Sequence, residues 1–197
     1  DLFPEFRGRD LSARGPARLV HRAQDGATVD ALEAQRRGVE EAADAVALVT
    51  VGGNDLLRGL MVDQGPGVEV FGRKISAFLE ALPIRPVFLA NVYDPTLGDD
   101  GKNFTGVPAA VARKNLARVN ATLRALAPRF GSLVDIHDHF LKGDASWFTS
   151  TIEPSLRGAS EVRRCFWPSL QAVLEAGPAR SADAPAADGA GLHGPHR

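Results

Sequence analysis

The chain has 197 residues, of which 44% are hydrophobic and 24% are charged, a composition typical of one folded globular domain and unlike that of disordered chains. Its 23 basic and 24 acidic residues give a formal net charge of −1, so no overall field favours binding to nucleic acid. No apolar run approaches the ~20 residues of a membrane span, and the single Cys165 excludes an intramolecular disulfide. No signal pattern is visible, so the compartment is cytoplasmic by default, and the oligomeric state is left open.

Four short runs rich in β-forming residues follow one another along the chain. Each is followed by a helical pattern, which is typical of parallel strands joined by helical crossovers and predicts the α/β class. The second and third runs are almost continuously apolar, as expected for strands covered on both faces. The runs are residues 18–21, 46–51, 86–92 and 133–136.

Three longer amphipathic segments are predicted to be helices that pack against this sheet. The first carries apolar residues at helical spacing over 71–82 and ends at Pro83. The second begins near Pro108 and ends before Pro128, and the third covers about 155–174. Residues 1–176 are therefore predicted to form the domain. Residues 177–197, rich in Ala, Gly and Pro, are predicted to be a disordered tail.

The residues after each strand matter most, because ligands of open parallel sheets bind beyond the carboxyl ends of the strands. The second run leads into Gly52-Gly53-Asn54-Asp55, where two glycines permit a tight turn and a carboxamide follows. The Asn54 amide can donate to a developing oxyanion, together with a backbone N–H such as that of Gly26. The alternative is a strand-to-helix turn in which Asn54 or Asp55 only caps the next segment.

These residues resemble blocks of the GDSL or SGNH hydrolase family over roughly residues 5 to 175. Gly52, Asn54 and Asp55 match the family's Gly-x-Asn-Asp block, and residues 25–28 resemble the block that carries a glycine. The resemblance implies a three-layer α/β/α sandwich with a parallel flavodoxin-like sheet. It also implies hydrolysis of a small-molecule ester without a cofactor, with Asn54 and the Gly26 amide as oxyanion donors.

The sequence departs from the family pattern at the nucleophile. The family's Gly-Asp-Ser block follows a central first strand, and nothing before Arg18 contains that strand or that motif. Ser12 follows no apolar run and is read as a loop or helix-edge residue. We therefore expect an incomplete domain whose serine is supplied from elsewhere, and a chain that is inactive by itself.

The second departure concerns the general base. The family's Asp-x-x-His-Pro block aligns with residues 150–154, which places Glu153 at the histidine position. Glu153 is a candidate base or a cap of the following helix. His137 and His139, just beyond the fourth run, are alternative bases, members of a structural hydrogen-bonded loop, or a weak metal pair that lacks a third ligand; no metal site is predicted.

The remaining candidate residues are assigned to substrate binding. Gly53 and Asp55 flank the donor Asn54, and Asp94 begins a turn-rich loop after the third run. Trp147 is expected to line or cover the cleft, with core packing as the competing interpretation. The leading function is an ester hydrolase that acts through an acyl-enzyme. The rival is a non-catalytic SGNH-like domain that binds a carbohydrate or another ligand, favoured by Glu153 at the histidine position.

Overall fold

The computed structural model describes residues 15–176, and the predicted tail (177–197) lies outside them. Three short parallel strands, β1, β2 and β3, form one sheet in sequential order, with Ala47 opposite Val87 and Val87 opposite Gly131. The strands cover Ala47–Thr50, Val87–Ala90 and Gly131–Val134. The α/β class and the parallel pairing predicted from the sequence are confirmed.

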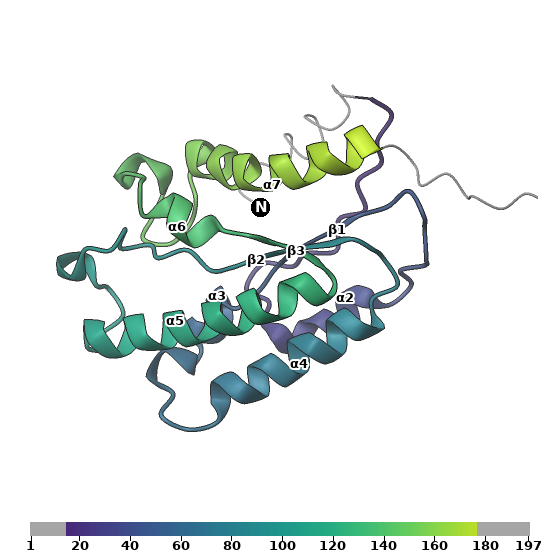
Figure 1. The fold of residues 1–197 in the computed structure, drawn as a ribbon. Helices are drawn as coiled ribbons and strands as arrows, with labels where there is room; N and C mark the ends of the chain where they lie inside the picture. The colour runs from purple at the N-terminus through teal and green to yellow at the C-terminus, as the bar shows by residue number, and fades with distance from the viewer. Residues whose placement is uncertain (1–14, 177–197) are drawn as a thin grey trace, which may run out of the picture.

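Helices cover both faces of this sheet, which makes three layers (Figure 1). Helices α2, α4 and α5 lie on one face, and α6 and α7 lie on the other. The α-helices are α2 (Leu32–Arg36), α3 (Gly53–Leu57), α4 (Gly67–Ala81), α5 (Ala109–Leu126), α6 (Ile136–Phe140) and α7 (Leu156–Ala176). Short 3-10 helices are η2 (Val29–Ala31), η3 (Leu60–Val62), η4 (Asp100–Lys102), η5 (Ala127–Arg129) and η6 (Ala145–Trp147). None of the helices within residues 15–176 has the length and apolarity that crossing a bilayer requires.

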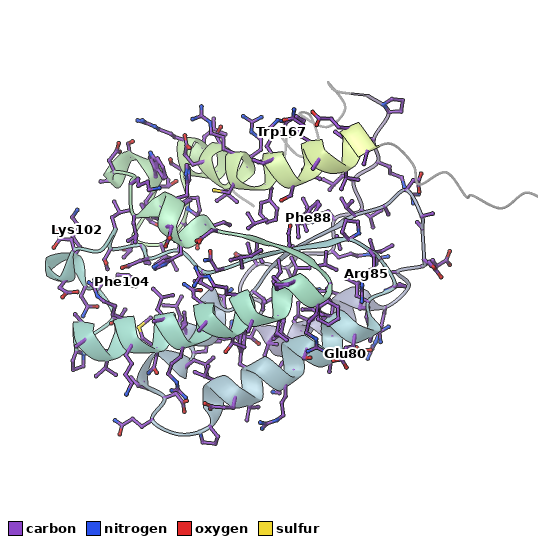
Figure 2. All side chains as sticks on the ribbon, in the orientation of Figure 1. Glu80, Arg85, Phe88, Lys102, Phe104 and Trp167 are labelled. Carbon is purple, nitrogen blue, oxygen red and sulfur yellow. The ribbon has the colours of Figure 1, made fainter. Side chains whose placement is uncertain are left out.

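Two hydrophobic clusters hold the layers together. The larger one joins α4 and α5 to the sheet, with Ile75, Leu79 and Leu123 fully buried. The smaller one lies under α7, where Figure 2 shows Phe88 between the sheet and that helix. This division explains the nearly continuous apolar sequence of β2, all four residues of which are buried.

The first predicted strand is wrong. Residues 18–21 have no strand pairing, and Leu19 and Val20 are 44% and 53% exposed. A strand needs a hydrogen-bonding neighbour, and among the described residues no strand precedes β1 to supply one. The local preference for extended backbone at this run is therefore not enough to make a strand.

The fourth predicted run also needs correction at its end. Strand β3 stops at Val134, and Ile136 is the first residue of α6 rather than part of the strand. The Asp135 carboxylate accepts a hydrogen bond from the Asp138 N–H at 3.1 Å and so caps the new helix. His137 and His139 consequently lie on a helical turn and not in a loop.

A buried amide fixes the chain where it leaves β2. Asn120 on α5 is 4% exposed, and its side-chain oxygen accepts from the Val92 N–H at 2.8 Å. Its amide nitrogen donates to the Val92 carbonyl at 2.9 Å. Because both backbone groups of Val92 are satisfied by one side chain, α5 sets the direction of the segment that follows β2.

We predict that Asn120→Ala lowers the free energy of unfolding by about 2–5 kcal/mol, because the Val92 N–H loses its partner and the Val92 carbonyl keeps only the contact with His137. The measurement is urea-induced unfolding followed by circular dichroism. Gln171→Ala removes an exposed amide from α7 and serves as the control, with an expected change of less than about 0.5 kcal/mol. A loss below about 1 kcal/mol for Asn120→Ala would show that water replaces the amide.

Candidate functional site

A cavity of about 430 Å³ lies at the carboxyl ends of β1 and β2. Its wall includes the segments that directly follow these two strands, residues 50–54 and 91–96. Residues 23–25, 27 and 28 and residues 152–154 complete the side nearest Asn54. Within residues 15–176 no group of His, Cys, Asp and Glu side chains is arranged to hold a metal ion.

Gly52 makes the turn from β1 into α3 possible. Its φ of +111° is one that residues with side chains rarely adopt. A Cβ there would also lie 3.1 Å from a Val92 methyl and 3.2 Å from a Val119 methyl. The turn therefore packs directly against the segment after β2 and against α5, and it places Gly53 and Asn54 on the cavity wall.

The side chain of Asn54 is held next to the Ala27–Thr28 peptide. Its Nδ2 donates to the Ala27 carbonyl at 3.0 Å, which uses one of its two N–H groups. Gly26 adopts φ +69°, and within residues 15–176 neither its N–H nor the second N–H of Asn54 has a hydrogen-bond partner. Asn54 lines the cavity, whereas Gly26 is not among the residues that line it, although Asp25 and Ala27 on either side of it are.

Arg58 adds a positive charge at this point. A Cβ on Gly26 would lie 3.3 Å from Arg58 Nη2, so the guanidinium covers the position that a side chain would take. Arg58 also donates its backbone N–H to the Asn54 carbonyl at 2.9 Å. The sequence analysis considered the residues at strand ends and did not single out Arg58. Arg58 lies four residues after Asn54, a spacing that places two residues on the same face of a helix.

Asp55 does not line the cavity. It is 9% exposed, and both carboxylate oxygens accept from the Val29 N–H at 3.1 Å, which fastens η2 to α3. Burial raises the pKa of Asp55, and the hydrogen bond from Val29 opposes this shift. Asp55 therefore has a structural role, because it joins η2 to α3.

Asp94 lines the cavity but is already occupied by its own loop. Its Oδ1 accepts from the Thr96 N–H at 2.9 Å and from the Thr96 hydroxyl at 2.7 Å. Its Oδ2 accepts from the Gly98 N–H at 3.3 Å. Asp94 is 8% exposed, so it contributes to the shape of the wall more than to polar contacts.

Glu153 lies on the cavity wall in a small hairpin. Phe148 and Pro154 form an isolated antiparallel bridge, and the Thr149 N–H donates to the Glu153 carbonyl at 2.8 Å. The Tyr93 hydroxyl, from the segment after β2, donates to the Ile152 carbonyl at 2.7 Å. Burial, with the nearby Glu153 charge, raises the pKa of Tyr93 to about 12. Tyr93 was not anticipated from the sequence, although it directly follows the apolar run 86–92.

His137 and His139 do not line this cavity. The Nδ1 atom of His137 lies 3.1 Å from the Val92 carbonyl, and its backbone N–H donates to Asn91. The Nε2 atom of His139 lies 2.9 Å from Glu161 Oε2 on α7. Both rings are therefore engaged in contacts between α6 and its neighbours.

Trp147 is packed beneath α7 and not at the cavity. It is 7% exposed and meets the rings of Phe140 and His139 at centroid distances of 5.1 and 5.3 Å. Core packing, the competing interpretation in the sequence analysis, describes this position. Cys165 packs against the same cluster, and burial raises its pKa to about 11.

The raised pKa of Asp55 gives a pH-dependent prediction. The pKa of Asp55 in the folded state lies above the unfolded value of about 3.9. The stability contributed by Asp55 therefore falls as pH rises through the range between these two pKa values. Asp55→Asn keeps an acceptor for Val29 and removes the titration. Its free energy of unfolding should therefore improve relative to the original protein as pH rises from about 3.5.

The measurement is urea unfolding across pH 3.5 to 7. Asp63→Asn is the control with the opposite sign. Desolvation by itself would raise the pKa of Asp63, but hydrogen bonds from the Gly65 and Val68 N–H groups lower it overall. Asp63→Asn should therefore lower the free energy of unfolding most at neutral pH. The same pH trend in both variants would contradict the raised pKa of Asp55.

Comparison with known families agrees with the architecture. A model of the GDSL-like Lipase/Acylhydrolase family matches residues 1–159, which include all three strands and most of the cavity wall. Comparisons with curated proteins and with solved structures gave no match. The chain belongs to the GDSL-like lipase/acylhydrolase family.

Proposed function

We propose that this domain hydrolyses a small-molecule ester through an acyl-enzyme, with Asn54 and the Gly26 amide as the oxyanion donors. The observation that carries the proposal is the hydrogen bond from Asn54 to the Ala27 carbonyl. This bond ties the amide to the residue that follows Gly26 and leaves its second N–H without a partner among residues 15–176. Family membership supports acyl hydrolysis as the reaction class.

The physical advantage of this arrangement is preorganisation. Donors that are already in place need no reorganisation when negative charge develops on the carbonyl oxygen, and such sites lower barriers strongly. Arg58, whose guanidinium lies against Gly26, adds a positive charge near that residue, although it is exposed and does not line the cavity. The three residues come from two segments that the β1–α3 turn brings together.

In the proposed reaction a serine Oγ attacks the ester carbonyl carbon, and the π electron pair moves onto the oxygen near Asn54 and Gly26. A base accepts the hydroxyl proton and returns it to the departing alcohol. Water then attacks the acyl-enzyme by the same route and releases a carboxylic acid. No cofactor is needed for these steps.

Glu153 is the candidate base that the geometry favours. Glu153 lines the cavity, but the other two candidate bases, His137 and His139, do not. Their rings contact Val92 and Glu161 instead. The Glu153 carboxylate has no hydrogen bond or ion pair among residues 15–176, so it is available to a substrate or to a nucleophile.

The nucleophile is proposed to lie outside the described segment. Residues 15–176 contain no serine on the cavity wall. The wall also carries threonines: the Thr96 hydroxyl donates to Asp94 and the Thr105 hydroxyl to Asn103, whereas Thr28 and Thr50 make no side-chain hydrogen bond among residues 15–176. A serine from outside this segment is proposed because the family pattern has a serine as its nucleophile.

Because Ser12 follows no apolar run and the serine is expected from outside this chain, the 197 residues by themselves should hydrolyse p-nitrophenyl acetate no faster than a heat-denatured control. A fluorophosphonate probe followed by peptide mass spectrometry should label no serine in residues 15–176. Turnover that disappears in Asn54→Ala, or a labelled serine within this segment, would overturn the proposed location of the nucleophile.

The alternative is a non-catalytic domain that binds a carbohydrate or another ligand. Glu153 at the position of the family's histidine favours this binding role, because the ordinary pKa of a carboxyl group lies farther from neutral pH than that of an imidazole. The coding sequence upstream of Asp1 discriminates the two functions. A Gly-Asp-Ser motif there supports the hydrolase, and its absence supports the binding domain.

In the protein as its own gene encodes it, Asn54→Ala should lower kcat for p-nitrophenyl acetate by about 10²–10³-fold with little change in KM. The reason is that the lost donor acts on charge that exists only in the transition state. Asn103→Ala is the matched control, because it removes an amide from the same cavity away from Gly26. Equal losses in the two variants, or an unchanged kcat in Asn54→Ala, would contradict the proposal.

A further inference from the structure

Glu153 lies on a hairpin that has few contacts of its own. Its backbone carbonyl accepts from the Thr149 N–H at 2.8 Å, and Phe148 and Pro154 form the isolated bridge that closes the turn. Residues 149–151 and Glu153 are exposed. A single hairpin of this size is marginally stable by itself, because it buries too little surface. The position of the hairpin must therefore be set by contacts with its neighbours.

One hydrogen bond ties this hairpin to the segment that follows β2. The Tyr93 hydroxyl donates to the Ile152 carbonyl at 2.7 Å. Within residues 15–176, the other hydrogen bonds of residues 149–153 stay inside the hairpin. Ile152 directly precedes Glu153 in the chain, and both line the cavity together with Tyr93. The phenol therefore acts one residue away from the carboxylate that is the candidate base.

The tyrosine ring is itself held from two sides. It stacks on Phe140 of α6 with centroids 4.7 Å apart and ring planes inclined by 19°, and it meets Phe148 at 5.8 Å. Aromatic pairs favour separations of this kind. The preceding residue, Val92, has both backbone groups bonded to Asn120 of α5. The hydroxyl is therefore presented to Ile152 from a firmly packed support.

We propose that Tyr93 is a positioning residue, which sets the place of the Glu153 carboxylate through its hydrogen bond to Ile152. The inference rests on the proposed function, in which Glu153 is the base. The carboxylate has no hydrogen bond or ion pair within the described residues, so its location depends on where its backbone lies. A displacement of about 1 Å in a catalytic group can lower a rate about 100-fold. A loose hairpin would slow the reaction without removing the base.

The first test measures the tether in the 197-residue chain itself. Tyr93→Phe removes the hydroxyl and keeps the ring stack. Hydrogen exchange of the Thr149 N–H, followed by ¹⁵N NMR, should become about threefold to tenfold faster, because the hairpin opens more often. Exchange of the Leu89 N–H in β2 should stay nearly unchanged. No change at Thr149, or an equal change at the two amides, would overturn the proposal.

The second test measures hydrolysis by the gene-encoded protein. Tyr93→Phe should lower kcat for p-nitrophenyl acetate about tenfold with little change in KM, because the base is displaced while the binding surface remains. Thr122→Val is the matched control. It removes a hydroxyl that donates to the Arg118 carbonyl within α5, away from the cavity, and should leave kcat nearly unchanged. Equal losses of kcat in the two variants would overturn the proposal.

The outcomes separate the positioning role from the proposed function. Lower kcat together with faster exchange at Thr149 would support both. If the original gene-encoded protein hydrolyses the ester and Tyr93→Phe keeps its kcat, the hydrolase stands and the positioning role is rejected. A raised KM with unchanged kcat would also reject it, because Tyr93 would then contact the substrate. If the original gene-encoded protein does not hydrolyse the ester, the proposed function is rejected, and faster exchange at Thr149 would show only a structural tether.

Discussion

The turn at Gly52 is the constraint on which the rest of the site depends. Its positive φ and its contacts with Val92 and Val119 allow β1 to pass into α3 without a gap. Any larger side chain would push the turn away from the segment after β2. Because Asn54 follows two residues later, this close packing decides where its amide can reach, and the Ala27 carbonyl then fixes its orientation.

A second layer of buried polar contacts keeps the ends of β2 and β3 in register with this turn. Asn91 donates from Nδ2 to Asp135 at 2.7 Å and accepts from the His137 N–H at 2.9 Å. Burial by itself would raise the pKa of Asp135, but hydrogen bonds from Asn91, Asp138 and Arg124 lower it overall. These side chains hydrogen-bond to backbone groups and to a charged carboxylate at the same time. Removing one of them therefore costs stability.

Much of this architecture could be predicted from the sequence. The continuous apolar run at 86–92 identified β2, which is buried throughout, and the run at 46–51 identified β1, but the expectation that β1 is covered on both faces was wrong, since Leu48 is 44% exposed and Thr50 is exposed. The long helices followed from apolar spacing and from Pro83 and Pro128. The run at 18–21 failed because strand formation depends on a partner, and composition carries no information about partners.

The site was harder to predict than the fold, for a related reason. The rule about strand ends predicts that Asn54, Asp55 and Asp94 lie together. Asn54 and Asp94 do line one cavity, whereas Asp55 turns away and accepts from the Val29 N–H. His137 and His139 follow β3 directly, but the helix that Asp135 caps carries their rings to Val92 and Glu161. Side-chain direction after a strand depends on the next few dihedral angles, which motif spacing does not report.

The link between Tyr93 and the hairpin that carries Glu153 has a further consequence for how this domain responds to alkali. A phenol with a pKa of about 12 keeps its proton throughout the range in which ester hydrolysis can be assayed. Its hydrogen bond to the Ile152 carbonyl therefore acts as a fixed tether over that range. Any pH dependence of the hydrolysis rate below about pH 10 must therefore arise from groups other than Tyr93.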